Sequence, residues 1–221
     1  MGILRKMNLL RSRRTLKENV FDSLFGNKTF LDIDYKTPSD YVSKYWRAYN
    51  DELKNRNIND SNKIKNLNGG IFELIIYTLF IREKLLPMYL QAKVAFIPNV
   101  EYDLIIYNKE VGPIGISLKT SLRERKKQAD LEAIALKYVH RKSECYLISM
   151  DEQEVSLAKR EIKEGYLLGL NDVILASDSE FDNFIKDLKS RSFTEAGMIE
   201  IISSNQIVTS EIVSQYGNNS K

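Results

Sequence analysis

The sequence predicts an α/β fold in which a mixed central β-sheet is flanked by helices. Residues 89–120 contain three apolar segments with strand-like patterns, joined by two short turns. Helical segments precede and follow them at residues 71–84 and 124–138, and a further apolar strand is expected at residues 144–150. At 221 residues the chain suits one domain, which we take to be residues 1–221.

The N-terminal part of the chain predicts helical additions to this core. Residues 5–25 mix basic and apolar residues in a loosely helical way, and residues 40–53 read as a helix with its aromatic residues towards an apolar surface. Residues 54–70 are rich in Asn and Lys and end in two glycines, which favours a loop. The helix at residues 71–84 is apolar almost all round, so we expect it to be central, and Pro87 helps to end it.

The central strands follow in order. The first is expected at residues 89–97, the second at residues 101–107 and the third at residues 114–120. A Pro-Asn turn and a hairpin connection at residues 108–113 separate them. Strands joined by such short turns are expected to be antiparallel neighbours.

The helix at residues 124–138 is expected to connect the third strand to the strand at residues 144–150. A helical connection of this kind predicts that the two strands are parallel. The apolar stripe that we expect to face the core consists of Leu131, Ile134, Ala135 and Tyr138.

The C-terminal part adds less regular features. The patterns favour a polar helix at residues 152–164, a fifth strand at residues 172–176 and a helix at residues 180–188. Residues 203–221 are mostly polar and are expected to form a mobile tail or an irregular lobe.

Composition argues against several classes of function. A formal charge of +3 does not by itself indicate a nucleic-acid-binding protein. One cysteine, Cys145, excludes an internal disulfide and fits a reducing compartment, while one histidine, His140, gives little support to a His/Cys zinc site or a histidine-based triad. We find no segment with the length and apolarity of a membrane span and no apolar core of a secretory signal. We therefore expect a cytoplasmic protein without membrane contact.

Charged residues of the second and third strands are expected to meet. Side chains alternate along a strand, so Asp103 lies on one face of the second strand, and Ser117 and Lys119 share a face of the third. If these strands pair through the turn at residues 108–113, Asp103 and Lys119 converge on one face of the sheet. A carboxylate and an ammonium would then lie side by side among apolar residues.

This arrangement can support metal-assisted cleavage of a phosphodiester. Asp103 can be the principal ligand of Mg²⁺, which prefers oxygen ligands, and the backbone carbonyl of Leu118 can reach the same ion. Lys119 can orient a water and stabilise negative charge that develops on the phosphate. Ser117 is a weak ligand, so we expect a further acid: either Glu132 in the helix after the third strand, or Glu73, which we place in the first turn of the central helix.

Basic residues cluster in two places. The Arg5–Lys17 segment is either a dimerisation element or a DNA clamp, and the sequence does not decide between them. The second cluster follows Lys119 closely, so its members are expected to contact DNA phosphates: Arg123, Arg125, Lys126 and Lys127.

On these residues the chain resembles the PD-(D/E)XK nucleases, and most of all the type II restriction endonucleases. The family pattern is an acid, a variable spacer, then an acid, any residue and a lysine. Asp103, Ser117 and Lys119 match it, with serine in place of the second acid and without the proline that precedes the first acid. The resemblance implies that a glutamate replaces the second acid, from the following helix (Glu132) or from the first core helix (Glu73).

The resemblance also implies a restriction-endonuclease-like core of helix, three strands, helix and strand at residues 69–150. Residues 1–68 and 151–221 would then serve dimerisation and DNA recognition. The expected activity is Mg²⁺-dependent, sequence-specific cleavage of double-stranded DNA by a homodimer. The alternatives are a DNA repair or junction-resolving nuclease of the same fold and a noncatalytic DNA-binding module, which the missing second acid favours.

Overall fold

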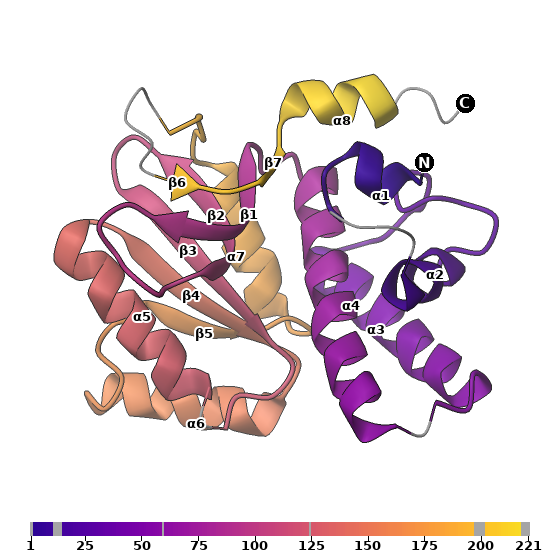
Figure 1. Ribbon diagram of the computed structural model, residues 1–221. Helices are drawn as coiled ribbons and strands as arrows, with labels where there is room; N and C mark the ends of the chain where they lie inside the picture. Colours follow the sequence, from indigo (N-terminus) through magenta and orange to yellow (C-terminus); the bar gives the residue numbers. More distant parts are fainter. Residues whose placement is uncertain (1, 11–14, 59, 124, 197–201, 218–221) are drawn as a thin grey trace.

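The computed structural model describes residues 2–10, 15–58, 60–123, 125–196 and 202–217. Within these residues, seven strands form one mixed sheet with helices on both faces (Figure 1), which confirms the predicted α/β class. The helices are α1 (Ile3–Lys6), α2 (Leu16–Ser23), α3 (Pro38–Asn55), α4 (Ser61–Arg82), α5 (Arg125–Val139), α6 (Glu152–Lys163), α7 (Ser179–Lys189) and α8 (Ser210–Gly217). The strands are β1 (Met88–Val94), β2 (Tyr102–Asn108), β3 (Gly112–Lys119), β4 (Glu144–Ser149), β5 (Asp172–Leu175), β6 (Ile202–Ser203) and β7 (Gln206–Val208).

The sheet order is β5-β4-β3-β2-β1-β6, and β7 also pairs with β1. Strands β1, β2 and β3 are antiparallel neighbours, as their short connections predict. Strands β3 and β4 are parallel because α5 carries the chain back across the sheet, and β5 continues the parallel arrangement. The predicted topology of the centre is therefore confirmed.

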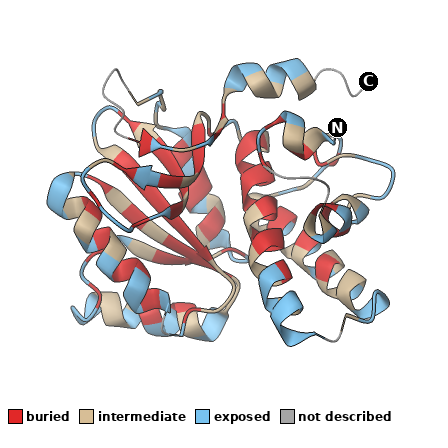
Figure 2. Ribbon diagram, in the orientation of Figure 1, coloured by how far each residue is buried: buried red, intermediate tan, exposed pale blue. Residues whose placement is uncertain are grey.

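Two hydrophobic clusters cover the two faces of the sheet. Leu104 and Ile106 of β2 pack into the cluster that contains α3, α4 and α7. Ile105 between them points the other way, into the cluster that contains α5 and α6, because side chains alternate along a strand. Figure 1 shows α5 and α6 in front of the sheet and α7 behind it, and Figure 2 shows that the buried residues concentrate in the sheet and in α4.

The central helix begins earlier than the sequence predicts. The predicted loop at residues 54–70 is wrong for residues 61–70, because α4 starts at Ser61 and contains both glycines, whereas the connection between α3 and α4 follows Asn55 as expected. Asp60 caps the helix by accepting hydrogen bonds from the backbone N–H groups of Asn62 and Lys63, at 2.9 and 3.1 Å. The polar residues that suggest a loop are the exposed first turns of this helix. Glu73 consequently lies in the middle of α4, and an explanation by the dipole of a first turn does not apply to it.

Helix α4 also bears on the question of a membrane span. Among the described residues it is the one helix that is long and apolar enough to cross a membrane by length and composition, so the expectation that no segment qualifies is wrong. However, 67% of its most apolar window is buried inside the fold. Its residues Ile71–Ile81 are buried on nearly every side, which is the pattern of a core helix.

Helix α5 faces the sheet with a different stripe from the predicted one. Leu131 and Tyr138 are 66% and 87% exposed, and Ile134 is also exposed. The stripe that packs inwards is Lys126, Ala129, Asp130, Ala133 and Leu136. Asp130 is buried because its carboxylate accepts three backbone hydrogen bonds from residues 168–170, at 2.7–3.1 Å. The face of α5 with small alanines and a fully hydrogen-bonded carboxylate therefore packs on the sheet, and the face with the larger apolar side chains is exposed.

The C-terminal segment is ordered into the sheet rather than forming a tail. Strands β6 and β7 pair with β1 on the side opposite β2. The two ends of the chain meet there: Gln206 donates to the carbonyl of Asn8 at 3.1 Å, and the Asn8 amide donates to the carbonyl of Ile207 at 3.2 Å. The expectation of a mobile or irregular end is therefore wrong for residues 202–217, while residues 218–221 lie outside the described part.

Candidate functional site

Asp103 and Lys119 meet on one face of the sheet, as the strand alternation predicts. The Nζ atom of Lys119 lies 2.6 Å from Oδ2 of Asp103, and the two side chains are 24% and 13% exposed. The backbone N–H of Leu118 donates to the same Oδ2 at 2.7 Å. Both bonds use Oδ2, so Oδ1 accepts no hydrogen bond from the described residues and remains available to a ligand.

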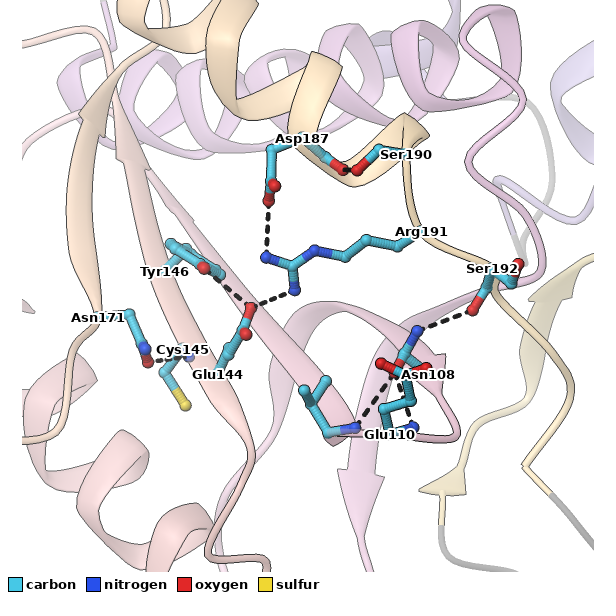
Figure 3. A network of polar contacts seen from close by, with 11 residues as sticks. Asn108, Glu110, Glu144, Cys145, Tyr146, Asn171, Asp187, Ser190, Arg191 and Ser192 are labelled. Atoms are coloured by element: carbon cyan, nitrogen blue, oxygen red, sulfur yellow. Dashed lines mark hydrogen bonds and ion pairs between the residues drawn. The ribbon is translucent and has the colours of Figure 1, made fainter.

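The register of β2 against β3 produces this meeting. Leu104 is opposite Ile116 and Ile106 is opposite Ile114, so Lys119 is diagonal to Asp103 across the pair. Asn108, at the end of β2, fixes the hairpin connection. Its side-chain oxygen accepts from the N–H of Glu110 at 2.8 Å, and its amide donates to the carbonyl of Ser192 at 2.9 Å (Figure 3).

A second group of polar contacts holds the neighbouring strand. Arg191, just after α7, forms ion pairs of 2.6 Å with Glu144 of β4 and with Asp187. Tyr146 donates to the same Glu144 carboxylate at 2.9 Å, as Figure 3 shows. Strand β4 is the parallel partner of β3, so these contacts support the strand that carries Lys119.

Ser117 is buried at 4% exposure on the same face as Asp103 and Lys119. Leu118 points to the other face, into the cluster with α4, and offers its backbone to the site through the N–H that binds Asp103. The register therefore places the backbone of residues 117–119 beside Asp103. Whether these groups bind a metal stays a prediction.

The charges of Asp103 and Lys119 both affect the pKa of Glu73. Burial, and next the charge of Asp103, raise the pKa of Glu73 to about 7, while Lys17 and Lys119 act in the opposite direction. Tyr77, one turn further along α4, donates to the backbone carbonyl of Asp103 at 2.8 Å. Helix α4 is thus joined to β2 at the site, and its Glu73 interacts with the charge of Asp103.

Glu132 approaches from α5 on the face that Asp103 occupies. Burial raises the pKa of Glu132, and a hydrogen bond of 2.8 Å from Gln128 lowers it, as does the charge of Lys119. The Tyr102 hydroxyl donates to the backbone carbonyl of Glu132 at 2.8 Å. Gly115 makes this possible, because a Cβ there would lie 2.6 Å from the Tyr102 ring.

The oxygen ligands near Asp103 are of the type that a hard cation prefers, but they are not close enough together to form a complete metal site. Asp103, Glu73 and Glu132 supply carboxylate oxygens, the ligand type that Mg²⁺ prefers. Within the part of the chain that the structure describes, no three His, Cys, Asp or Glu side chains lie close enough together to hold a metal. A cation at Oδ1 of Asp103 would need Glu73 or Glu132 to move towards it.

The predicted phosphate contacts divide into two groups. Arg123, Arg125 and Lys127 are exposed. Lys126 is buried at 8% exposure and forms an ion pair of 2.6 Å with Glu161, so its ammonium already has a partner in the fold, and its contact with DNA stays a prediction.

The loop after Lys119 is itself held in place. Glu154, in the first turn of α6, accepts hydrogen bonds from the backbone N–H groups of Leu122 and Arg123. At the other basic cluster, Arg5 forms an ion pair with buried Glu18. Arg5 is thus tied to α2, whereas residues 11–14 of that cluster lie outside the described part.

A cavity of about 690 Å³ opens beside the site. Glu73 and Tyr77 line it, and the Tyr77 hydroxyl also donates to the Asp103 carbonyl, so one residue contacts both the cavity and the strand that carries Asp103. The other polar residues of its wall come from segments distant in the chain: Thr15, Lys17, Lys63, Asn66, Gln91, Glu101 and Gln206. The sequence placed Lys17 in the basic Arg5–Lys17 segment but did not predict the cavity that these residues line. Gly70 is the one signal for the place of Lys17, because it is a glycine inside a helix where the Lys17 side chain needs room.

Comparison of the chain with protein-family models, with curated proteins and with solved structures finds no match in any of the three.

Proposed function

We propose that this protein is a Mg²⁺-dependent endonuclease that hydrolyses phosphodiester bonds of double-stranded DNA at a specific sequence, as a type II restriction enzyme does. The observation that carries the proposal is the 2.6 Å contact between Asp103 and Lys119 on two paired strands. Glu73 and Glu132 flank this contact from α4 and α5, which is the pair of positions from which the resembling nucleases draw a replacement acid. The restriction-endonuclease-like core is part of the same proposal.

Each residue has a distinct task in this proposal. Asp103, with Oδ1 free among the described residues, is the principal ligand for Mg²⁺, and Glu73 or Glu132 takes the place of the second acid. Bound Mg²⁺ supplies neutralisation of the phosphate and a more acidic water. Lys119 leaves Asp103 to orient the attacking water and to stabilise charge that develops on the phosphate oxygens. Exposed Arg123, Arg125 and Lys127 contact flanking phosphates.

Three further parts of the proposal concern the assembly and its place. A homodimer would bring two sites to the two strands of a palindromic target, and sedimentation of the protein with and without DNA tests it. A core that buries its apolar helix and has no disulfide suits the cytoplasm. The flanks at residues 1–68 and 151–221 are the regions where sequence recognition would lie.

A second candidate is a noncatalytic DNA-binding module. The observation that favours it is that Ser117 replaces the second acid and that no three potential ligands among the described residues form a close group. The same fold without a working metal site would bind DNA through its basic residues alone.

The test is cleavage of plasmid DNA with Mg²⁺, with EDTA as the control. Discrete fragments support a sequence-specific endonuclease, while a smear or cutting of branched DNA alone supports a repair or junction nuclease. Binding without cutting supports the noncatalytic module. Asp103→Ala and Lys119→Ala should each abolish cleavage while DNA binding remains, and full activity in either variant would refute the site.

The replacement acid is identified by a matched pair. Glu73→Ala and Glu132→Ala remove carboxylates that approach Asp103 from opposite elements, so the variant that needs more Mg²⁺ for half-maximal cleavage marks the ligand. Glu152→Ala is the control, since Glu152 is an exposed glutamate that does not line the cavity. An unchanged Mg²⁺ requirement in both test variants contradicts the role of either glutamate.

A further inference from the structure

Lys17 occupies a position that its local structure does not favour. It lies in the first turn of α2, directly after the N-cap Thr15 and Leu16. A cation at a helix N-terminus is repelled by the helix dipole. Lys17 is nevertheless half-buried in the wall of the cavity next to Glu73. No described residue forms a hydrogen bond or an ion pair with its ammonium, so local pairing does not explain the position.

The opposite wall is shaped to admit this lysine. Gly70 lies inside α4, where glycine destabilises a helix relative to alanine. A Cβ at Gly70 would overlap the aliphatic stem of Lys17 and would lie 3.2 Å from its Nζ atom. Gly69, its neighbour in the same helix, has nothing within 4 Å of the equivalent position. Of the two glycines, Gly70 is thus the one whose missing Cβ leaves room for another side chain, and that side chain is Lys17.

The charges of Lys17 and Lys119 both act on one acid, Glu73. Glu73 interacts with both charges, and Tyr77 of the same helix connects the cavity wall to Asp103. Lys63 and the side-chain amide of Gln91 line the same cavity. Two unfavourable local choices, a cation at a helix N-terminus and a glycine inside a helix, thus place a cation in the cavity that Glu73 and Tyr77 also line. Such exceptions to local preference concentrate at functional sites.

We propose that Lys17 binds a phosphate of the DNA backbone adjacent to the bond at Asp103, and that Gly70 exists to seat it there. This inference rests on the proposed function for its choice of DNA as the ligand. The cavity side of α4 then serves as the track of the strand that passes Asp103, with Lys17 on one side of the site and the exposed Arg123, Arg125 and Lys127 after β3. Lys17 acts as a binding residue, since it makes no contact with Asp103.

The experiment measures binding of the intact protein to a random-sequence DNA duplex in EDTA, over a series of salt concentrations. Lys17→Gln should lower the slope of log affinity against log salt by about one, and should weaken binding about eightfold at 0.1 M salt, since each neutralised phosphate contributes about 0.9 to the slope. Lys28→Gln removes the same charge from an exposed position outside the cavity, and it should change the slope less.

A second pair of variants tests whether the space at Gly70 positions the Lys17 side chain. Gly70→Ala should weaken binding because the new methyl group displaces Lys17, whereas Gly69→Ala adds the same helix propensity without meeting another atom and should bind as the wild type does. The inference is overturned if Lys17→Gln keeps the wild-type slope, if the wild type binds no duplex at low salt, or if Gly69→Ala weakens binding as much as Gly70→Ala. A separate plasmid-cleavage assay of the wild type distinguishes the two proposals: if the wild type does not cleave but Lys17→Gln has a lowered salt slope, the nuclease is contradicted and the Lys17 site is supported.

Discussion

Replacement of Glu73 by glutamine should stabilise the metal-free protein at alkaline pH and change little at acid pH. Burial raises the pKa of this carboxyl from 4.5 to about 7 in the folded protein, with the charge of Asp103 as the second cause. The folded protein therefore keeps a proton that the unfolded chain releases between these two values. The stability that depends on this proton is complete below pH 4.5 and is lost as the pH rises through about 7.

The magnitude follows from the two pKa values. Their difference, 7 − 4.5, is about 2.5, which corresponds to about 3.4 kcal/mol of unfolding free energy at about 1.36 kcal/mol for each pKa unit. A glutamine amide must also be buried, which offsets part of this gain. We expect Glu73→Gln to be more stable than the wild type by about 2 kcal/mol at pH 8.5 and by much less at pH 4.5.

The assay is urea unfolding in EDTA at both pH values, followed by a signal from the aromatic residues. Glu101→Gln is the matched control, because Glu101 is an exposed glutamate of the same cavity and its replacement should change stability little at either pH. Equal gains for Glu73→Gln at the two pH values would show that the charge of Glu73 is not responsible. A loss of stability at pH 8.5 would refute the idea that the fold bears a cost to keep this carboxylate buried.

Two further predictions concern residues around the site. Asn108→Ala should lower the unfolding free energy by about 1–3 kcal/mol, because it leaves the hairpin N–H groups of residues 110 and 111 without their acceptor; unchanged urea unfolding would contradict the role of Asn108 in fixing the register. Lys127→Gln should weaken DNA binding with little change in stability, whereas Lys126→Gln should lower stability by about 2 kcal/mol because it leaves Glu161 without its buried partner. Binding titrations and urea unfolding of both variants would contradict this assignment if the two effects were exchanged.

Local patterns were sufficient to predict the centre of the fold. Short turns fix antiparallel neighbours, a helical connection fixes a parallel pair, and strand alternation places Asp103 beside Lys119. These inferences succeed because each depends on residues close in the chain or on a single strand register. The roles assigned to Asp103 and Lys119 stay predictions.

The wrong predictions concern residues whose burial or contacts depend on segments distant in the chain. On α5 the apolarity of Leu131 and Tyr138 favoured one stripe. The hydrogen bonds that bury Asp130, however, come from residues 168–170, which lie 38–40 residues further along the chain. At the start of α4 the Asn- and Lys-rich composition favoured a loop, although Asp60 provides a helix cap. The contact of Lys17 with Gly70 joins residues of two separate helices, and only the unexplained glycine marks it in the sequence.

The pairing of β1 with β2 on one side and with β6 and β7 on the other has a consequence for biosynthesis. Strand β1 is expected to emerge from the ribosome with β2 as its first neighbour, and its other side has no partner until residues 202–208 have been made. During that interval the exposed N–H and C=O groups of Met88 to Leu90 are open to another nascent or misfolded chain. A chain that stops short of β6 would keep this flank bare permanently, so premature termination near the end should yield insoluble protein even though the Asp103–Lys119 pair has been synthesised in full.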